Sequence, residues 1–280
     1  MTIKLLIVEG NLQEENQNFK NAGIQTHTES LKDSLAYITK DLDIDVVNPS
    51  ADPKIFENIG NLEKYDGTVW GGSSLNIYNN TEEIKRQIMF MKECQKKIKK
   101  ILAICWGMQV AVVAAGGEVK KSSNGSHIGI AFDIELNPNG QRHPIYKGKK
   151  NKFCSPAFNF DEVVTLPKDA TLLASNNINK ISSISFTHKK SEIWGIQYHP
   201  EIKYEKMIEL IKFRKDRLIN QRKAFKSYDE IDHHISLIEN ELSKFSKQRK
   251  MELILPCLYS ELEGEALPKI VDEISKTKYL

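Results

Sequence analysis

The sequence predicts an α/β protein with a mainly parallel central sheet, followed by a C-terminal helical extension. Short apolar runs alternate with helix-like stretches over the first two hundred residues, as in a layered α/β fold. Between residues 128 and 198, short β-like pieces are separated by Asn, Gly, Pro and Ser, which is typical of meander or edge strands. Beyond Glu201, apolar residues recur at helical spacing, and residues 203–280 contain a single glycine, Gly264. We therefore divide the chain into an α/β domain at residues 1–202 and a helical extension at 203–280 that packs on or caps the core.

Each element follows from a local pattern. We expect strands at residues 3–8, 43–47, 67–70 and 101–104, and later at 128–136, 162–166, 171–174, 181–187 and 193–198. Helical spacing of apolar residues is found in the polar segment 16–40 and in a helix that Thr81 can cap. Small residues at 107–115 predict another helix. In the extension, breaks are expected near Ser227, Pro256 and Pro268.

Composition limits the function classes. The chain has 280 residues, a net charge of +3 and 40% hydrophobic residues, enough for a buried core. No apolar run approaches the ~18 residues of a membrane span, and the apolar run at the N-terminus is too short for a signal peptide.

The charges are interspersed, which argues against nucleic acid as a partner. The four cysteines form no C-x-x-C pair, which weakens zinc and thioredoxin interpretations, and we expect a reducing cytoplasmic location.

Cys105 follows the apolar run at 101–104 and precedes the small-residue helix. Ala103 and Gly107, two positions to either side, complete the small-x-nucleophile-x-small pattern of a nucleophile elbow. Such a turn presents the thiol at the C-terminal edge of the sheet, where the N–H groups of a helix start favour the thiolate. The alternative is that Cys105 is an ordinary small buried residue.

The apolar run at 193–198 leads into His199, Pro200 and Glu201. Residues i and i+2 of an extended backbone point to the same side, so the histidine and the glutamate can share one face. A cysteine nucleophile needs a base to take its proton and a carboxylate to orient that base. With the elbow elsewhere in the chain, Cys105, His199 and Glu201 therefore predict a catalytic triad, whereas a lone histidine here would more often be structural.

Two glycines, Gly71 and Gly72, end the strand at 67–70. Glycines let backbone N–H groups approach a bound carbonyl closely, as an oxyanion hole requires. The N–H groups of Gly72 and Trp106 are the candidate donors. A plain loop would explain the glycine pair on its own, and no phosphate-binding lysine motif follows it.

Together, the motifs at 66–72, 103–109 and 195–201 resemble the class I glutamine amidotransferases in order and spacing. Residues 105–109 followed by 116–119 resemble stand-alone proteins similar to the glutaminase domain of GMP synthase. The resemblance covers about residues 1–201, and the helical tail also looks like that of bacterial stand-alone members. It implies a flavodoxin-like, three-layer core with a mainly parallel sheet.

The resemblance also implies a chemistry. Cys105 would attack the side-chain carbonyl of glutamine or a γ-glutamyl amide, and a γ-glutamyl thioester would release an amine and then glutamate. His199 would be the acid/base and Glu201 its orienter, with Gly72 and Trp106 as the oxyanion hole. Gly71, Gln109 and Asn159 would bind substrate. We expect no metal and no cofactor.

Several departures from the family pattern leave alternatives open. Ala103 stands where Gly is usual, Ser73 where Pro is common, and Asn159 where the family has His. The chain has no S-G-G-x-D-S pyrophosphatase loop, so it cannot itself activate a nucleotide. The missing loop and Asn159 favour a catabolic γ-glutamyl hydrolase. The alternatives are a glutaminase subunit that passes ammonia to a separate synthetase, and an inactive binding or regulatory module; a homo-oligomer is also conceivable.

Overall fold

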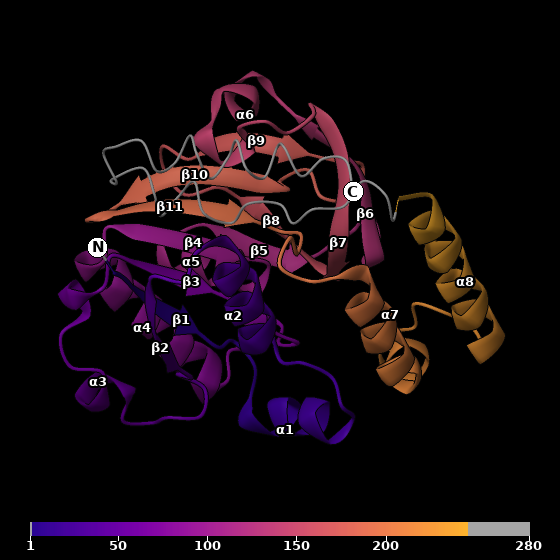
Figure 1. Ribbon diagram of the computed structural model, residues 1–280, viewed down its shortest axis with the longest axis horizontal. Helices are drawn as coiled ribbons and strands as arrows, with labels where there is room; N and C mark the ends of the chain where they lie inside the picture. The colour runs from indigo at the N-terminus through magenta and orange to yellow at the C-terminus, as the bar shows by residue number, and fades with distance from the viewer. Residues whose placement is uncertain (1, 246–280) are drawn as a thin grey trace.

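A nine-stranded sheet in the order β2-β1-β3-β4-β11-β10-β9-β6-β7 runs through the computed structural model, which describes residues 2–245 (Figure 1). Two further strands, β5 and β8, pair separately. The strands are β1 (Ile3–Val8), β2 (Leu42–Val47), β3 (Gly67–Trp70), β4 (Lys100–Ile104), β5 (Glu118–Lys121), β6 (His127–Leu136), β7 (Lys152–Asn159), β8 (Asp161–Thr165), β9 (Thr171–Ser175), β10 (Ser183–His188) and β11 (Ser191–Ile196).

The sheet has a parallel and an antiparallel half. Strands β2, β1, β3, β4 and β11 are parallel neighbours. Strands β10, β9, β6 and β7 continue the sheet in antiparallel fashion. The parallel half confirms the predicted α/β class, and the antiparallel half corresponds to the short β-like pieces of residues 128–198. Because β11 lies parallel to β4, the residues that follow these two strands emerge at the same edge of the sheet.

Helices and short turns connect the strands. They are α1 (Gln13–Asn21), α2 (His27–Ile38), α3 (Ile55–Asn58), η1 (Leu62–Lys64), η2 (Ile77–Asn79), α4 (Glu82–Lys97), α5 (Trp106–Ala114), α6 (Pro138–Arg142), η3 (Pro144–Tyr146), α7 (Tyr204–Phe213), the π-helical turn η4 (Arg217–Gln221) and α8 (Tyr228–Phe245). None of these described helices is both long and apolar enough to cross a membrane.

Both faces of the inner parallel strands β1, β3, β4 and β11 are largely buried, whereas the edge strand β2 is part-exposed. In β1, Leu6 and Val8 belong to the hydrophobic core beneath α4 and α5, whereas Leu5 and Ile7 belong to the core on the side of α2. Successive side chains of a strand point to opposite faces, so a strand between two helical layers is apolar throughout. The result is the predicted three-layer arrangement.

Two strands were missing from the sequence prediction. Strand β7 contains Pro156 and is the last strand of the sheet, where proline is tolerated because one side needs no ladder hydrogen bonds. Strand β5 is short and mostly exposed. The single polar helical segment expected at 16–40 is in fact two helices: Gly23 (φ 72°) follows α1, and Thr26 begins α2 with a capping box to Glu29.

The extension begins with α7 and packs against the antiparallel half (Figure 1). Ile128 and Ile130 of β6 share a hydrophobic cluster with Ile211 of α7 and Ile235 of α8. The expected break near Ser227 falls where α8 begins. The breaks near Pro256 and Pro268 lie outside the described residues. The boundary at 202/203 stays a prediction, and the extension reaches back to the functional site described next.

Candidate active site

Cys105 lies at a sharp turn between β4 and α5. Its φ of 51° and ψ of −103° are strained for a residue with a side chain, as a nucleophile elbow requires. Its N–H donates to the carbonyl oxygen of Ile196, at 2.7 Å, which ties the turn to β11. At Gly107, a Cβ would lie 2.5 Å from the carbonyl oxygen of Trp70, so only glycine fits there. The structure therefore supplies the close packing that the small flanking residues predicted.

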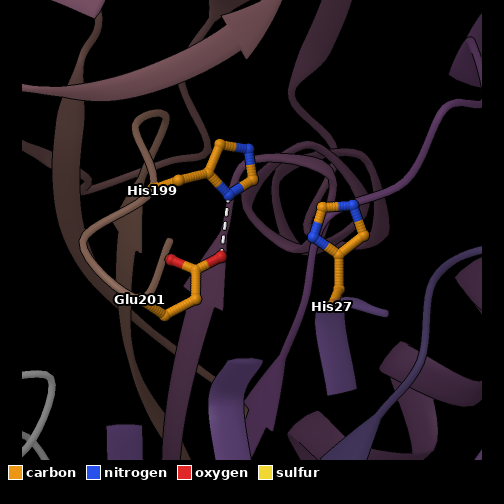
Figure 2. A group of neighbouring side chains, drawn as sticks. All are labelled: His27, His199 and Glu201. Carbon is orange, nitrogen blue, oxygen red and sulfur yellow. Dashed lines mark hydrogen bonds and ion pairs between the residues drawn. The ribbon is translucent and has the colours of Figure 1, made fainter. Parts of the chain in front are cut away.

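His199 and Glu201 follow β11 and are both buried. Nδ1 of His199 lies 2.8 Å from Oε1 of Glu201, and Figure 2 shows the carboxylate beside the ring. The backbone of this segment is fixed at two points: His199 N donates to the carbonyl of Pro156, and Ser34 Oγ donates to the carbonyl of Glu201. The i, i+2 spacing thus brings the two side chains together as expected.

Cys105 lies near enough to His199 to interact with its ring electrostatically. Burial alone would lower the pKa of His199, but the charges of Glu201 and Cys105 and the hydrogen bond to Glu201 outweigh it and raise this pKa to about 10. The ring is therefore a protonated imidazolium at neutral pH, held between a carboxylate and a sulfur. This arrangement can supply a proton to a leaving group and stabilise a thiolate.

His27, at the start of α2, is a site residue that the sequence reasoning missed. Its ring stacks on that of His199 with 5.6 Å between centroids and 19° between planes (Figure 2). Burial, followed by the positive charges of Lys206, His199 and Arg214, lowers the pKa of His27 well below its usual value. Among the described residues its Nδ1 has no hydrogen-bond partner. The neutral ring of His27 thus stacks on the charged ring of His199.

His27, His199 and Glu201 also form the group of described residues best placed to hold a metal, with ligand atoms within 4.8 Å of one another. Two nitrogens and one carboxylate oxygen form a donor set that first-row metals accept. However, the hydrogen bond to Glu201 and the electrostatic interaction with Cys105 already engage His199. These contacts fit proton transfer better than metal ligation.

The Gly71–Gly72 loop lies against the elbow. Gly107 N donates to the carbonyl of Gly71 at 3.2 Å, and a Cβ at Gly72 would lie 2.8 Å from Cε1 of His199. Trp106 is the first residue of α5, where a backbone N–H has no acceptor within the helix. Its indole Nε1 donates to Oε1 of Gln87 and fixes the side chain. Gly72 therefore lies against His199 and Trp106 directly follows the nucleophile, while their role as oxyanion donors stays a prediction.

Gln197 is a second residue absent from the sequence prediction. Its Nε2 donates to Sγ of Cys105 at 3.3 Å, and its Oε1 accepts from Nε2 of Gln109 at 3.4 Å. The signal was present in the sequence, because residues 197, 199 and 201 alternate and share one side of an extended segment. Gln109 is thereby connected to the nucleophile through Gln197.

A cleft leads to Cys105. Trp106, Gln109 and Asn159 line it. The Asn159 amide is held within the wall, because its Oδ1 contacts His127 and its Nδ2 donates to Asn179 and to the backbone of Asp161. Gly71 meets the elbow through its backbone rather than lining the cleft.

The other cysteines differ from Cys105. Cys94 is fully buried in the core, and burial raises the pKa of its thiol far above the usual range. Cys154 is part-buried beside the cluster that joins β6 to α7. Cys257 lies outside the described residues. The structure therefore brings only one described cysteine against a histidine–carboxylate pair.

Comparisons with known proteins show what the chain is similar to. The model of the family "Glutamine amidotransferase class-I" matches residues 22–215. A γ-glutamyl-L-1-hydroxyisopropylamide hydrolase of a Pseudomonas species is 32% identical over 203 residues, which cover 71% of this chain and 68% of that protein. One of the subunits of a glutamine-hydrolysing GMP synthase from Methanococcus maripaludis is 31% identical over 111 residues, 40% of this chain and 55% of that one.

A solved glutamine amidotransferase from Thermotoga maritima superposes with a TM-score of 0.63 at 18% identity, covering 97% of this chain and 99% of its own. At that identity the likeness concerns the fold, and it agrees with the flavodoxin-like layering. The matched region spans about two thirds of the Pseudomonas hydrolase and about half of the GMP synthase protein.

Proposed function

The chain belongs to the class I glutamine amidotransferase family, and from that premise we propose that Cys105, His199 and Glu201 are its catalytic triad. The reaction is hydrolysis of the side-chain amide of glutamine or of a γ-glutamyl amide. The observation that carries the proposal is the position of His199, which lies 2.8 Å from the Glu201 carboxylate and interacts electrostatically with Cys105.

The steps follow from these contacts. The Cys105 sulfur attacks the γ-carbonyl carbon, and the carbonyl π electrons move onto oxygen. As the tetrahedral intermediate collapses, the C–N bond breaks and His199 donates its proton to the departing amine. A γ-glutamyl thioester remains on Cys105. His199 then takes a proton from water, the water oxygen attacks the thioester, and glutamate leaves while the sulfur is restored as a leaving group.

Gly72 and Trp106 supply the backbone N–H donors for the oxyanion in this proposal. Each such donor typically contributes about 2.7–4 kcal/mol of barrier lowering. Gln197 donates to the sulfur and is held by Gln109, so the pair orients the nucleophile. Gly71 ties the donor loop to the elbow, and Asn159 shapes the wall beside the bound γ-glutamyl group.

Substitution of the nucleophile tests this proposal. Cys105→Ala should lower kcat by at least ~10³-fold for every γ-glutamyl substrate, because a triad acts as a unit. Cys154→Ala removes another described thiol without touching Cys105 and serves as the control. Glutamate release from glutamine and from a panel of γ-glutamyl amides is the readout. A Cys105→Ala variant as active as wild type would overturn the mechanism, and a wild-type protein inactive on the whole panel would favour a binding module.

A second candidate is a glutaminase subunit of a separate synthetase, supported by the match to the GMP synthase protein. The two functions differ in substrate preference. A catabolic hydrolase should process N-substituted γ-glutamyl amides at least as well as glutamine, whereas a synthetase component should accept glutamine and reject substituted amides. The ratio of kcat/KM for γ-glutamylmethylamide to that for glutamine distinguishes them.

A further inference from the structure

Three arginines of the C-terminal extension line the cleft that contains Cys105: Arg214, Arg217 and Arg222. Arg214 directly follows α7, and the other two stand at the start of η4 and directly after it. In the sequence these residues belong to a stretch of mixed charge with no catalytic motif. Folding places all three along the wall of one cleft.

Arg214 is the buried member of this arginine group. Its Nη2 lies 2.8 Å from Oε1 of Glu15, and its guanidinium lies 5.2 Å from the ring centres of both Phe19 and Phe158. Within the described residues, its buried Nε has no hydrogen-bond acceptor. Such an orphaned donor at a cleft wall is a place where a ligand oxygen can bind.

Arg217 and Arg222 are half-buried, and each donates one hydrogen bond to the loop after β3, while Nη1 of Arg217 also lies 3.8 Å from Oε1 of Glu15. Nη2 of Arg217 donates to the carbonyl of Ser74 at 3.0 Å, and Nη2 of Arg222 donates to Oδ1 of Asn76 at 3.1 Å. The Arg222 guanidinium also lies over the ring of Phe160. A guanidinium has five N–H donors in a planar fork, so these anchors leave room for bidentate binding of a carboxylate.

Charge balance points to an anionic ligand. The three guanidinium groups have two carboxylates as neighbours, Glu15 and Asp161, and Lys121 adds a further positive charge near Asp161, so positive charge is in excess at this wall. Burial, followed by the charges of Arg214 and Arg222, lowers the pKa of Arg217, which shows that the cations repel one another. Glutamine is a zwitterion and would leave that excess charge in place. A γ-glutamyl compound with a carboxylate on its amine half would neutralise it.

We propose that Arg217 and Arg222 bind a carboxylate on the amine half of the substrate, which makes γ-glutamyl amino acids and γ-glutamyl peptides the preferred substrate class. This inference rests on the hydrolase function proposed above. Arg214 sets the position of the pair by anchoring the end of α7 on Glu15. The extension is then a specificity element, which recognises the part of the substrate that leaves.

The test compares γ-glutamylglycine with γ-glutamylglycinamide, which are nearly identical in size and differ in the carboxylate. The quantity is the ratio of their kcat/KM values, measured for wild type, for the double variant Arg217→Gln/Arg222→Gln and for Arg217→Lys/Arg222→Lys. Comparison across variants cancels the intrinsic difference between the two leaving amines. Lys212→Gln is the control, since it removes a positive charge from exposed α7 surface outside the cleft.

If the two arginines bind the carboxylate through charge-assisted hydrogen bonds, Arg217→Gln/Arg222→Gln should lower the ratio of kcat/KM for γ-glutamylglycine to that for γ-glutamylglycinamide by at least ~10-fold relative to wild type. The lysine double variant should keep more of the ratio than the glutamine one, and Lys212→Gln should leave it unchanged. If Arg217→Gln/Arg222→Gln is active and has the same ratio as wild type, this inference is overturned and the proposed hydrolase function is not. Absence of hydrolysis of glutamine and both γ-glutamyl compounds by wild type would overturn the proposed function and this inference together.

Discussion

Replacement of Glu201 by Gln removes the carboxylate of the proposed triad and keeps the shape of the side chain. Burial lowers the pKa of His199, and Glu201 makes the largest of the contributions that outweigh it. Without the negative charge, burial should prevail and the ring should lose its proton at a lower pH. The rise of this pKa from 6.5 to about 10 corresponds to a few kcal/mol of preference for the imidazolium, on the order of 1.4 kcal/mol per unit.

The sign of the pH effect follows from the raised pKa. Protonated His199 contributes stability that is fully present below pH 6.5 and is lost as the pH rises through about 10. The alkaline limb of activity should therefore lie near pH 10 in wild type. In Glu201→Gln this limb should move down by about 1 pH unit or more. The variant should also lose roughly 10²–10⁴-fold in kcat, as expected when a triad carboxylate is removed.

The assay measures glutamate release from one γ-glutamyl amide between about pH 6 and pH 10.5. This range includes both the ordinary and the raised pKa of His199. The pH profiles of kcat and of kcat/KM are fitted separately. Glu205→Gln, an equal charge loss on the exposed first turn of α7, is the matched control and should keep the wild-type profile. Circular dichroism checks that both variants fold. If Glu201→Gln keeps the wild-type alkaline limb and a kcat within about tenfold of wild type, the assigned role of the carboxylate is wrong.

Three further substitutions probe the surroundings of His199 and Cys105. Gly72→Ala places a Cβ 2.8 Å from Cε1 of His199 and should lower kcat about 10²-fold through displacement of the ring, whereas unchanged kinetics would contradict this packing. Gln197→Leu removes the donor to the sulfur and should lower kcat/KM about 10–100-fold, so a value equal to wild type would exclude that role. His27→Ala leaves a cavity beside His199 and should reduce the free energy of unfolding by about 2–4 kcal/mol in denaturant titrations. His27→Phe keeps a stacked ring and should reduce the free energy of unfolding less. Equal reductions in the two variants would refute the stacking argument.

Local patterns were enough to predict much of the parallel half and the nucleophile turn. The strands at 3–8, 67–70 and 101–104 are buried on both faces, so they read as apolar runs bounded by turn residues. The elbow was predictable because backbone packing restricts residue 107 to glycine. His199 and Glu201 were predictable because their i, i+2 spacing is itself the geometry of an extended segment.

Other features depend on contacts between segments far apart in the chain. His27 lies 172 positions before His199 (199 − 27), and nothing in its own helix indicates that it will stack on that ring. The cleft arginines are indistinguishable in sequence from the solvated lysines and arginines around them, because their burial depends on how η4 packs. Strand β7 was missed because its proline lowers β propensity, and only its place at the sheet edge makes it acceptable.

Rapid-quench mass spectrometry tests the central claim most directly. Wild-type protein mixed with a γ-glutamyl amide, quenched in acid and digested, should yield the peptide that contains Cys105 with the added mass of one γ-glutamyl group. The adduct should be absent in Cys105→Ala and should persist longer in a variant slowed at the hydrolysis step, such as Glu201→Gln. Substrate turnover without any adduct on Cys105, or with the adduct on another cysteine, would contradict the account.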